Sequence, residues 1–258
     1  MQYKAIFFDM DGTLTDLSTH QVPDSAIQAL REAQARGVKI FLATGRPPQM
    51  LLPATEAIPF DGHLTANGQF CYNDKEVIYR NTIPQADKES LVELLKTHDI
   101  PLLFETESEL YFTKIDERVQ RAKELLDFPL FPVRAPVNCL TQNLFMFILF
   151  GDARAETLVT QAMPSCKSVR WINIFTDIIP ANGGKEVGIS AMLDYYGISR
   201  EEAMAFGDAQ NDVGMLTHVG LGVSMGSGTP EAKAAADYIT DAPKADGIYN
   251  ALKTFEVI

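Results

Sequence analysis

Two aspartates stand at the end of a short apolar run near the start of the chain, in the stretch AIFFDMDGT. The run 4–9 is typical of a strand buried on both faces, and it ends on Asp9, with Asp11 two positions later. Carboxylates so close together repel each other, and the repulsion raises their pKa unless a cation offsets it. The pattern indicates a site where one carboxylate is held charged by a metal ion while the other exchanges a proton.

Small and polar residues follow the next predicted strand, over 38–43. Thr44 and Gly45 offer a hydroxyl and a backbone N–H at a predicted strand-to-helix junction, where the helix dipole favours an anion. Gly12 lets the backbone turn sharply after the aspartates and expose further N–H groups. We therefore expect anion binding at Gly12, Thr44 and Gly45, and Arg46 is a candidate contact to the substrate beyond the bound anion.

A third predicted strand, over 203–207, ends in the stretch GDAQND, which contains Asp208, Asn211 and Asp212. Ligands of an open parallel sheet bind outside the carboxyl ends of its strands, so these side chains share an edge with the first two aspartates if the strands are neighbours. Oxygen ligands without His or Cys are typical of Mg²⁺, which retains waters and binds a substrate phosphate. The candidate metal ligands are Asp9, Asp11, Asp208 and Asp212.

A lysine follows a pair of glycines at the predicted start of a helix, in the stretch GGKEVG. Lys185 would supply a fixed positive charge, and together with a metal ion and backbone donors it describes a phosphoryl-transfer site. Asp9 is then the candidate nucleophile. Asp11 is the candidate general acid/base, which protonates the leaving group and then deprotonates the attacking water.

The elements that would carry these residues alternate between strand and helix in the first and last parts of the chain. A helix predicted over 23–37 joins the first two strands, and the alternation returns after about residue 184. From about 84 to 180 the pattern changes to helices and hairpins and resembles an α+β unit. We therefore expect an α/β domain with a parallel sheet, interrupted by an inserted domain.

The composition limits the expected partners. The chain has 22 basic and 34 acidic residues, a net charge of −12, and this field repels polyanions, so we expect no binding to nucleic acid or an anionic membrane. The three scattered cysteines are expected to be buried free thiols. No stretch approaches the ~20 apolar residues of a membrane-spanning helix and none reads as a signal peptide, so we expect a cytoplasmic protein.

Four segments together resemble the ordered motifs of the haloacid dehalogenase superfamily: DMDGT, ATGR, Lys185 after its glycine pair, and GDAQND. The middle block lies between the second and third motifs, as in the Cof-like sugar-phosphate phosphatases, and Asn67-Gly68 is also similar to that subfamily. The resemblance implies a Rossmann-like core over 1–83 and 181–258. It also implies that 84–180 is an α/β cap domain that closes over the substrate and selects it.

The resemblance implies a role for each motif residue. Asp9 would be the nucleophile and a Mg²⁺ ligand, and Asp11 would be the general acid/base, with its backbone carbonyl on the metal ion. Asp208 would bind the metal directly, and Asp212 would hold a metal-bound water. The residues implied to bind the phosphoryl group are Thr44, Gly45, Lys185 and Asn211.

Three positions lie outside these roles. His20, shortly after the first motif, and Trp171, in the inserted block, are candidate contacts to the substrate. Gly214 stands where many members of the superfamily carry an acidic residue, a departure that concerns the local helix and leaves the chemistry untouched.

These observations predict a Mg²⁺-dependent phosphatase that hydrolyses a small phosphorylated metabolite, with a sugar phosphate favoured, through an aspartyl-phosphate. A phosphotransferase or phosphomutase could use the same residues, passing the phosphoryl group to a hydroxyl instead of water. A phosphometabolite-binding regulator without turnover is a further alternative, although it would not need a general acid two residues from the nucleophile. A monomer suffices for a cap that closes on its own core, and we expect a monomer.

Overall fold

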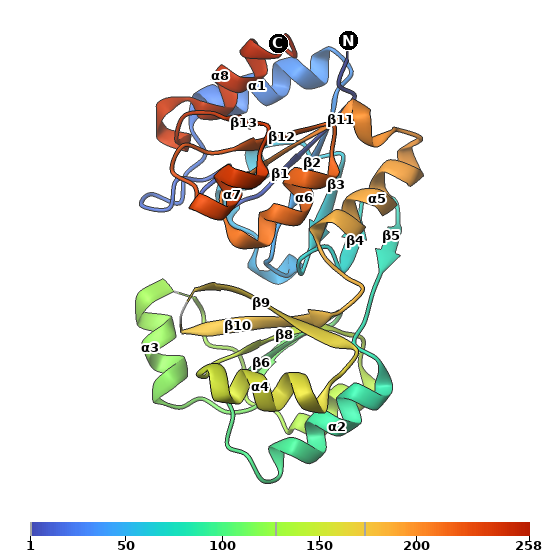
Figure 1. The fold of residues 1–258 in the computed structure, drawn as a ribbon, viewed down its shortest axis with the longest axis vertical. Coiled ribbons are helices and arrows are strands. Elements are labelled where there is room, and N and C mark those ends of the chain that lie inside the picture. Colours follow the sequence, from blue (N-terminus) through green and yellow to red (C-terminus); the bar gives the residue numbers. More distant parts are fainter. Residues whose placement is uncertain (1, 127, 173) are drawn as a thin grey trace. The chain divides into compact units, whose positions relative to one another are not determined.

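The computed structural model describes residues 2–126, 128–172 and 174–258, which form two compact units. One unit contains Met1–Tyr79 and Gly184–Ile258, and the other contains Arg80–Gly183, so the chain leaves the first unit once and returns to it (Figure 1). The structure divides the chain at 79/80 and 183/184, whereas the sequence placed the boundaries at 83/84 and 180/181. That the inserted unit selects the substrate stays a prediction.

The first unit is built on an eight-stranded sheet with the order β13-β12-β11-β1-β2-β3-β4-β5. The pairs from β13 to β3 are parallel, and β4 runs antiparallel to β3. The sheet order places β1 in the interior, and its four residues AIFF are all buried, as expected for a strand covered on both faces. The strands are β1 (Ala5–Phe8), β2 (Lys39–Ala43), β3 (Gly62–Thr65), β4 (Phe70–Tyr72), β5 (Val77–Arg80), β11 (Ala203–Gly207), β12 (Leu221–Ser224) and β13 (Tyr238–Ile239).

Helices cover both faces of this sheet (Figure 1). Successive residues of β1 enter opposite cores, because Phe7 stacks on Phe41 and Phe8 stacks on Phe206, each pair with ring centroids 4.8 Å apart. One face carries α1 (Asp24–Ala35) and α8 (Gly247–Thr254), and the other carries α5 (Lys185–Tyr196), α6 (Val213–His218) and α7 (Pro230–Ala235). Short 3₁₀ helices are η1 (Pro48–Met50), η2 (Pro53–Ala57), η4 (Arg200–Glu202), η5 (Gln210–Asp212) and η6 (Pro243–Ala245).

The second unit is built on a five-stranded sheet with the order β7-β6-β8-β10-β9, in which each neighbouring pair is antiparallel. Its helices α2 and α4 pack on one face of the sheet around buried residues such as Leu91, Phe147 and Val159. The elements are α2 (Gln85–Leu95), β6 (Leu102–Thr106), β7 (Leu110–Phe112), α3 (Glu117–Leu126), η3 (Pro136–Thr141), β8 (Leu144–Leu149), α4 (Ala153–Ala162), β9 (Cys166–Ile172) and β10 (Phe175–Pro180).

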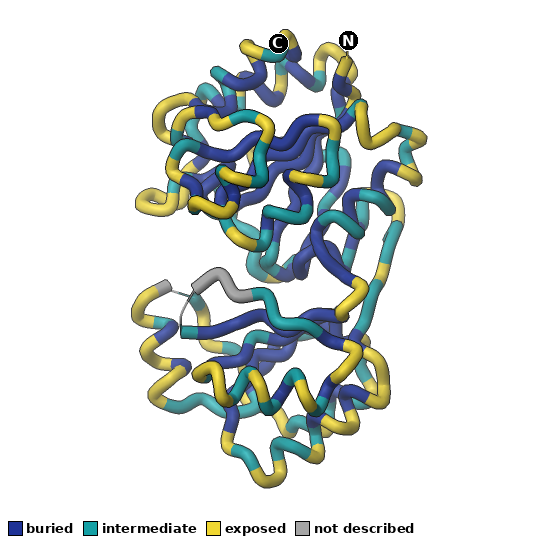
Figure 2. The backbone as a smooth tube through the Cα atoms, in the orientation of Figure 1, coloured by how far each residue is buried: buried dark blue, intermediate teal, exposed yellow. Residues whose placement is uncertain are grey.

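The fold confirms the predicted class, an α/β protein with a parallel-sheet core and an inserted α+β unit. All three cysteines are free and buried, as expected. Figure 2 shows central strands such as β1 and β11 as buried backbone, whereas the edge strand β5 is intermediate to exposed. No helix within the described residues is both long and apolar enough to cross a membrane. The helix predicted within 23–37 is α1, which begins at Asp24, after Pro23, and ends at Ala35, and Gly37 lies just beyond its end with a φ of +89°.

Candidate active site

The predicted site residues follow three neighbouring strands of the eight-stranded sheet. β1 lies between β2 and β11 and is parallel to both, with Phe8 opposite Leu42 and Phe206. Because parallel strands end at the same edge, Asp9 comes to lie beside the residues that follow β2 and β11. The three strands are therefore neighbours, as the predicted site requires.

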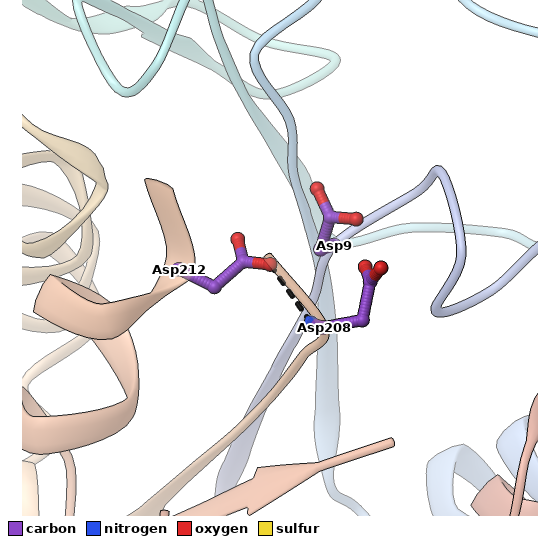
Figure 3. Close-up of side chains that lie close together, drawn as sticks. All are labelled: Asp9, Asp208 and Asp212. Atoms are coloured by element: carbon purple, nitrogen blue, oxygen red, sulfur yellow. Dashed lines mark hydrogen bonds between the residues drawn. The ribbon is translucent and has the colours of Figure 1, made fainter. Parts of the chain in front are cut away.

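Three of the four predicted metal ligands form one buried cluster (Figure 3). One carboxylate oxygen from each of Asp9, Asp208 and Asp212 lies within 4.8 Å of the others, and all three side chains are buried. Asp212 is held in place by two backbone donors, since its Oδ2 accepts from the N–H of Asp208 at 2.9 Å and of Ala209 at 3.0 Å. The cluster offers hard oxygen ligands only, which suits Mg²⁺.

Lys185 reaches the cluster from the first turn of α5. Its Nζ donates to Oδ1 of Asp9 and to Oδ1 of Asp212, both at 2.6 Å, and its side chain is fully buried. Burial lowers the pKa of Lys185, but the attraction of Asp212 and Asp9 outweighs that effect and raises its pKa above the usual range. The lysine therefore stays charged at neutral pH.

One ammonium does not compensate three carboxylates. Burial raises the pKa of Asp9 well above its usual value, and Asp212 and Asp208 add to the rise, while Lys185 opposes it. Burial and Asp212 also raise the pKa of Asp208 to about 7, although a hydrogen bond from Thr13 lowers it. Burial is the largest cause of both shifts, and the neighbouring carboxylates add to it, so a divalent cation would favour the charged form of both groups and fits the cluster.

Gly12 allows one of the predicted ligands to approach the backbone. Its φ is +86°, and a Cβ at this position would lie 2.4 Å from Oδ2 of Asp208, so a side chain here would displace that carboxylate. Thr13 fixes the other oxygen of Asp208, because its Oγ1 donates to Oδ1 at 3.0 Å. The structure thus gives Gly12 a role in positioning Asp208, and its predicted contact with phosphate stays a prediction.

The side chain of Asp11 does not join the cluster and is bound by Arg46 instead. Nε of Arg46 donates to Oδ2 of Asp11 and Nη2 donates to Oδ1, both at 2.8 Å, in a two-pronged ion pair. Nη1 of the same guanidinium donates to the carbonyl of Met50 at 3.2 Å. No pattern in the sequence pointed to this pair, and the predicted contact between Arg46 and the substrate stays a prediction.

Thr44 and Gly45 follow β2 as predicted, but no α-helix begins there. The chain continues through loops and the 3₁₀ helices η1 and η2, so an anion at this point would bind loop donors and not a helix N-terminus. Oγ1 of Thr44 accepts from the backbone N–H of Arg46 at 3.1 Å. Asn211 lies close by, and its Nδ2 donates to Oδ1 of Asn67 at 3.2 Å.

Two predicted substrate contacts are not tested by the structure. His20 is exposed, with a φ of +54°, and its backbone N–H donates to the carbonyl of Asp16 at 2.8 Å. Trp171 lies on β9, but its side chain falls outside the described part of the structure. Both assignments stay predictions.

Gly214, two residues after the motif GDAQND, packs against a carboxylate from another helix. A Cβ at Gly214 would lie 2.4 Å from Oε2 of Glu186, and a Cβ at Gly184 would lie 2.2 Å from Oε1 of the same side chain. Glu186 is the second residue of α5, and Gly214 is the second of α6. A carboxylate therefore lies beside Gly214 even though position 214 itself has no side chain.

Comparison with known proteins identifies the family. The model of the haloacid dehalogenase-like hydrolases matches residues 6–252. Over 254 residues the chain is 32% identical to YkrA of Bacillus subtilis (strain 168), covering 98% of each chain. The solved structure of BT4131, described as a subclass IIB sugar phosphatase, matches with a TM-score of 0.89 and 35% identity over 99% of this chain and 100% of that one.

A second solved structure, BT1666 from Bacteroides thetaiotaomicron, is described among phosphatases of the same superfamily. It matches with a TM-score of 0.92 and 32% identity over 99% of this chain and 96% of that one. The chain therefore belongs to the haloacid dehalogenase-like hydrolase family, and the family predicted from the four motifs is confirmed.

Proposed function

We propose that the protein is a Mg²⁺-dependent phosphatase that hydrolyses small phosphorylated metabolites through an aspartyl-phosphate. The observation that carries the proposal is the buried cluster of Asp9, Asp208 and Asp212 with Lys185 bonded into it. A cluster that binds both a cation and, through the cation and the lysine, an anionic phosphoryl group is the arrangement that phosphoryl transfer requires.

Asp9 is the proposed nucleophile. Lys185 donates to its Oδ1, which leaves Oδ2 to attack phosphorus, and the charge of the lysine opposes the rise in the pKa of Asp9 that burial causes. As the new O–P bond forms, the bond between phosphorus and the substrate oxygen breaks, and Asp11 gives that oxygen a proton. Asp11 then takes a proton from water, which attacks phosphorus and releases phosphate and free Asp9.

The metal would be held by Asp9 and Asp208, with the backbone carbonyl of Asp11 as a further ligand and Asp212 holding a bound water. When bound, Mg²⁺ offsets the charge of the phosphoryl oxygens and of the ligating carboxylates. Gly12 and Thr13 serve this site by admitting and fixing the Asp208 carboxylate. Thr44, Gly45, Lys185 and Asn211 are the proposed donors to the phosphoryl oxygens.

The proposed substrate class is sugar phosphates. Support comes from the solved relative that is described as a sugar phosphatase and is similar over the whole length of this chain. We propose that the unit Arg80–Gly183 is the cap that selects the substrate. A monomeric state and a cytoplasmic location stay predictions.

The test is phosphate release from a panel of sugar, nucleotide and cofactor monophosphates, with and without Mg²⁺. Wild type should release phosphate only with the metal, and Asp9→Asn should be inactive yet show an unchanged circular dichroism spectrum. Near-normal turnover by Asp9→Asn would show that the nucleophile is another group. A folded wild type that transfers phosphate to an added hydroxyl compound and releases none to water would replace hydrolase with transferase.

A further inference from the structure

A turn with an unusual backbone follows β3 (Gly62–Thr65) in the first unit. Three consecutive residues, Ala66, Asn67 and Gly68, have φ values of +50°, +54° and +79°. This left-handed conformation is unfavourable for L-residues other than glycine, and it persists only where the surroundings impose it. Neighbouring segments must therefore hold this turn in place.

The turn is hydrogen-bonded to the loop that follows β2. The N–H of Ala66 donates to the carbonyl of Arg46 at 2.9 Å, and the N–H of Asn67 donates to the carbonyl of Thr44 at 3.0 Å. Nε2 of Gln69 donates to the carbonyl of Asn67 at 3.0 Å and closes the turn. The backbone of the turn is thus tied to the segment proposed to bind the phosphoryl group.

The other side of the turn contacts the start of α5. A Cβ at Gly68 would lie 2.5 Å from the carbonyl oxygen of Gly184 and 3.0 Å from Cα of Lys185, so only glycine fits here. The turn therefore lies between two segments of the site, the loop after β2 and the first residues of the helix that carries Lys185.

The Asn67 side chain meets a third segment. It is buried, and its Oδ1 accepts from Nδ2 of Asn211 at 3.2 Å. Both amides lie over Gly45, since a Cβ there would be 3.2 Å from Oδ1 of Asn67 and 3.6 Å from Nδ2 of Asn211. Gly45 leaves room for this pair, and a Cβ there would make a tight contact with Oδ1 of Asn67.

We propose that Asn67 is a positioning residue that orients the amide of Asn211 toward the phosphoryl group; this assignment rests on the proposed function. The bond to Asn67 uses one N–H of Asn211 Nδ2 and leaves the second N–H to donate to an anionic oxygen. An asparagine suits the position because it tolerates a positive φ and supplies an acceptor without a charge that would repel phosphate.

Four variants separate the side chain from the backbone. Asn67→Gly removes the acceptor and keeps the left-handed turn relaxed, whereas Asn67→Ala removes the acceptor and strains the turn. Asn67→Asp keeps the acceptor oxygen, and aspartate also tolerates the positive φ of this turn, but it places a negative charge beside the anion. Ala66→Gly is the matched control, because it relaxes the backbone one residue earlier and leaves the Asn67 side chain intact.

The readouts are kcat and KM for a substrate from the panel, the inhibition constant of inorganic phosphate, and the melting temperature. Asn67→Gly should lower kcat/KM and weaken phosphate inhibition by about tenfold, as expected for a hydrogen bond to a charged group, with most of the effect in KM. Asn67→Asp should lower kcat/KM at least as much as Asn67→Gly does. If the role of Asn67 were purely structural, Asn67→Asp would keep the kinetics of wild type. Ala66→Gly should stay within about twofold of wild type, a change of less than half a kcal/mol.

A double-mutant cycle tests whether Asn67 acts through Asn211. In the Asn211→Ala background, Asn67→Gly should change kcat/KM by less than about twofold, because the amide to be oriented is gone. An equal loss in both backgrounds, or wild-type kinetics for Asn67→Asp, would overturn the assignment. Wild-type protein that neither hydrolyses the esters nor is stabilised by phosphate with Mg²⁺ would overturn the proposed function, and this inference with it.

Discussion

Among the described residues, Arg46 is the side chain that orients the carboxylate of Asp11. Two nitrogens of Arg46 each donate to a different oxygen of Asp11, and such paired hydrogen bonds fix both position and plane. The group that would pass a proton to the leaving group is thus held by an arginine on the loop after β2. The two residues are 35 positions apart in the sequence, so the fold and not the local chain brings them together.

Replacing Arg46 should therefore harm proton transfer more than phosphoryl binding. We expect Arg46→Ala to lower kcat for an alkyl phosphate by about 10²-fold, within the range of general acid catalysis, because its leaving group needs a proton. The loss should be much smaller for p-nitrophenyl phosphate, whose leaving group does not. Steady-state kinetics with both substrates is the measurement, and Arg46→Lys, which keeps the charge but not the two-pronged geometry, is the matched variant.

Equal losses with both substrates would contradict this positioning role. They would indicate that Arg46 acts on the phosphoryl group itself or on the substrate beyond it, which is the contact expected from the sequence.

Helices α5 and α6 meet at Gly214, where the Glu186 carboxylate occupies the space of a side chain. Glycine inside a helix is less favourable than alanine by up to about 1 kcal/mol, but a methyl group here would have to displace the carboxylate. We expect Gly214→Ala to be nearly neutral in wild type and to stabilise the Glu186→Ala variant by about 1 kcal/mol. Urea unfolding of the four proteins measures the difference, and identical effects in both backgrounds would argue against the contact.

The strand β6 carries a buried acid that the proposed chemistry does not use. Glu105 is almost fully buried and its Oε2 has no hydrogen-bond partner within the described residues. Burial, and then the nearby Asp177, raise the pKa of Glu105 well above its usual value. An acid whose pKa is raised on folding stabilises the native state below its unfolded pKa, and that contribution is lost as the pH rises through the folded pKa.

The isosteric variant Glu105→Gln should remove this pH dependence, because the amide stays neutral. We expect the variant to match wild type at pH 5 and to have a higher melting temperature at pH 8. Thermal unfolding at both pH values, with Glu124→Gln at an exposed position of α3 in the same unit as the control, measures the effect. A wild type as stable as the variant at pH 8 would show that Glu105 is solvated or paired.

At the scale of the whole molecule, the two ends of the inserted unit meet. Nδ2 of Asn81 donates to Oδ1 of Asn182 at 3.2 Å, and the unit has its own buried core. Domains inserted with adjacent ends usually fold on their own. We expect residues 80–183, produced alone, to unfold cooperatively on heating and to show native-like chemical-shift dispersion; a disordered spectrum would show that the unit needs the rest of the chain.

The sequence was sufficient to predict which strands carry the site residues, because Asp9, Thr44 and Asp208 each follow an apolar run that becomes a parallel strand. It was also sufficient for the insertion, since the strand–helix alternation stops and resumes. It could not show the Arg46–Asp11 pair or the bond between Asn211 and Asn67, which depend on how loops fold back across 35 and 144 positions. The missing helix after Thr44 reflects the prolines that follow, which favour 3₁₀ turns.

The central place of β1 in its sheet has a consequence for the way the chain is made. Its neighbour β11 begins at Ala203, so β1 leaves the ribosome long before one of its two edges can be paired. The inserted unit, whose strands all come from one continuous stretch, can complete itself in the meantime. A nascent chain that stops just before Ala203 would carry the complete inserted unit and an apolar strand with one unpaired edge, to which chaperones can bind. It would also lack Asp208 and Asp212 of the proposed metal site.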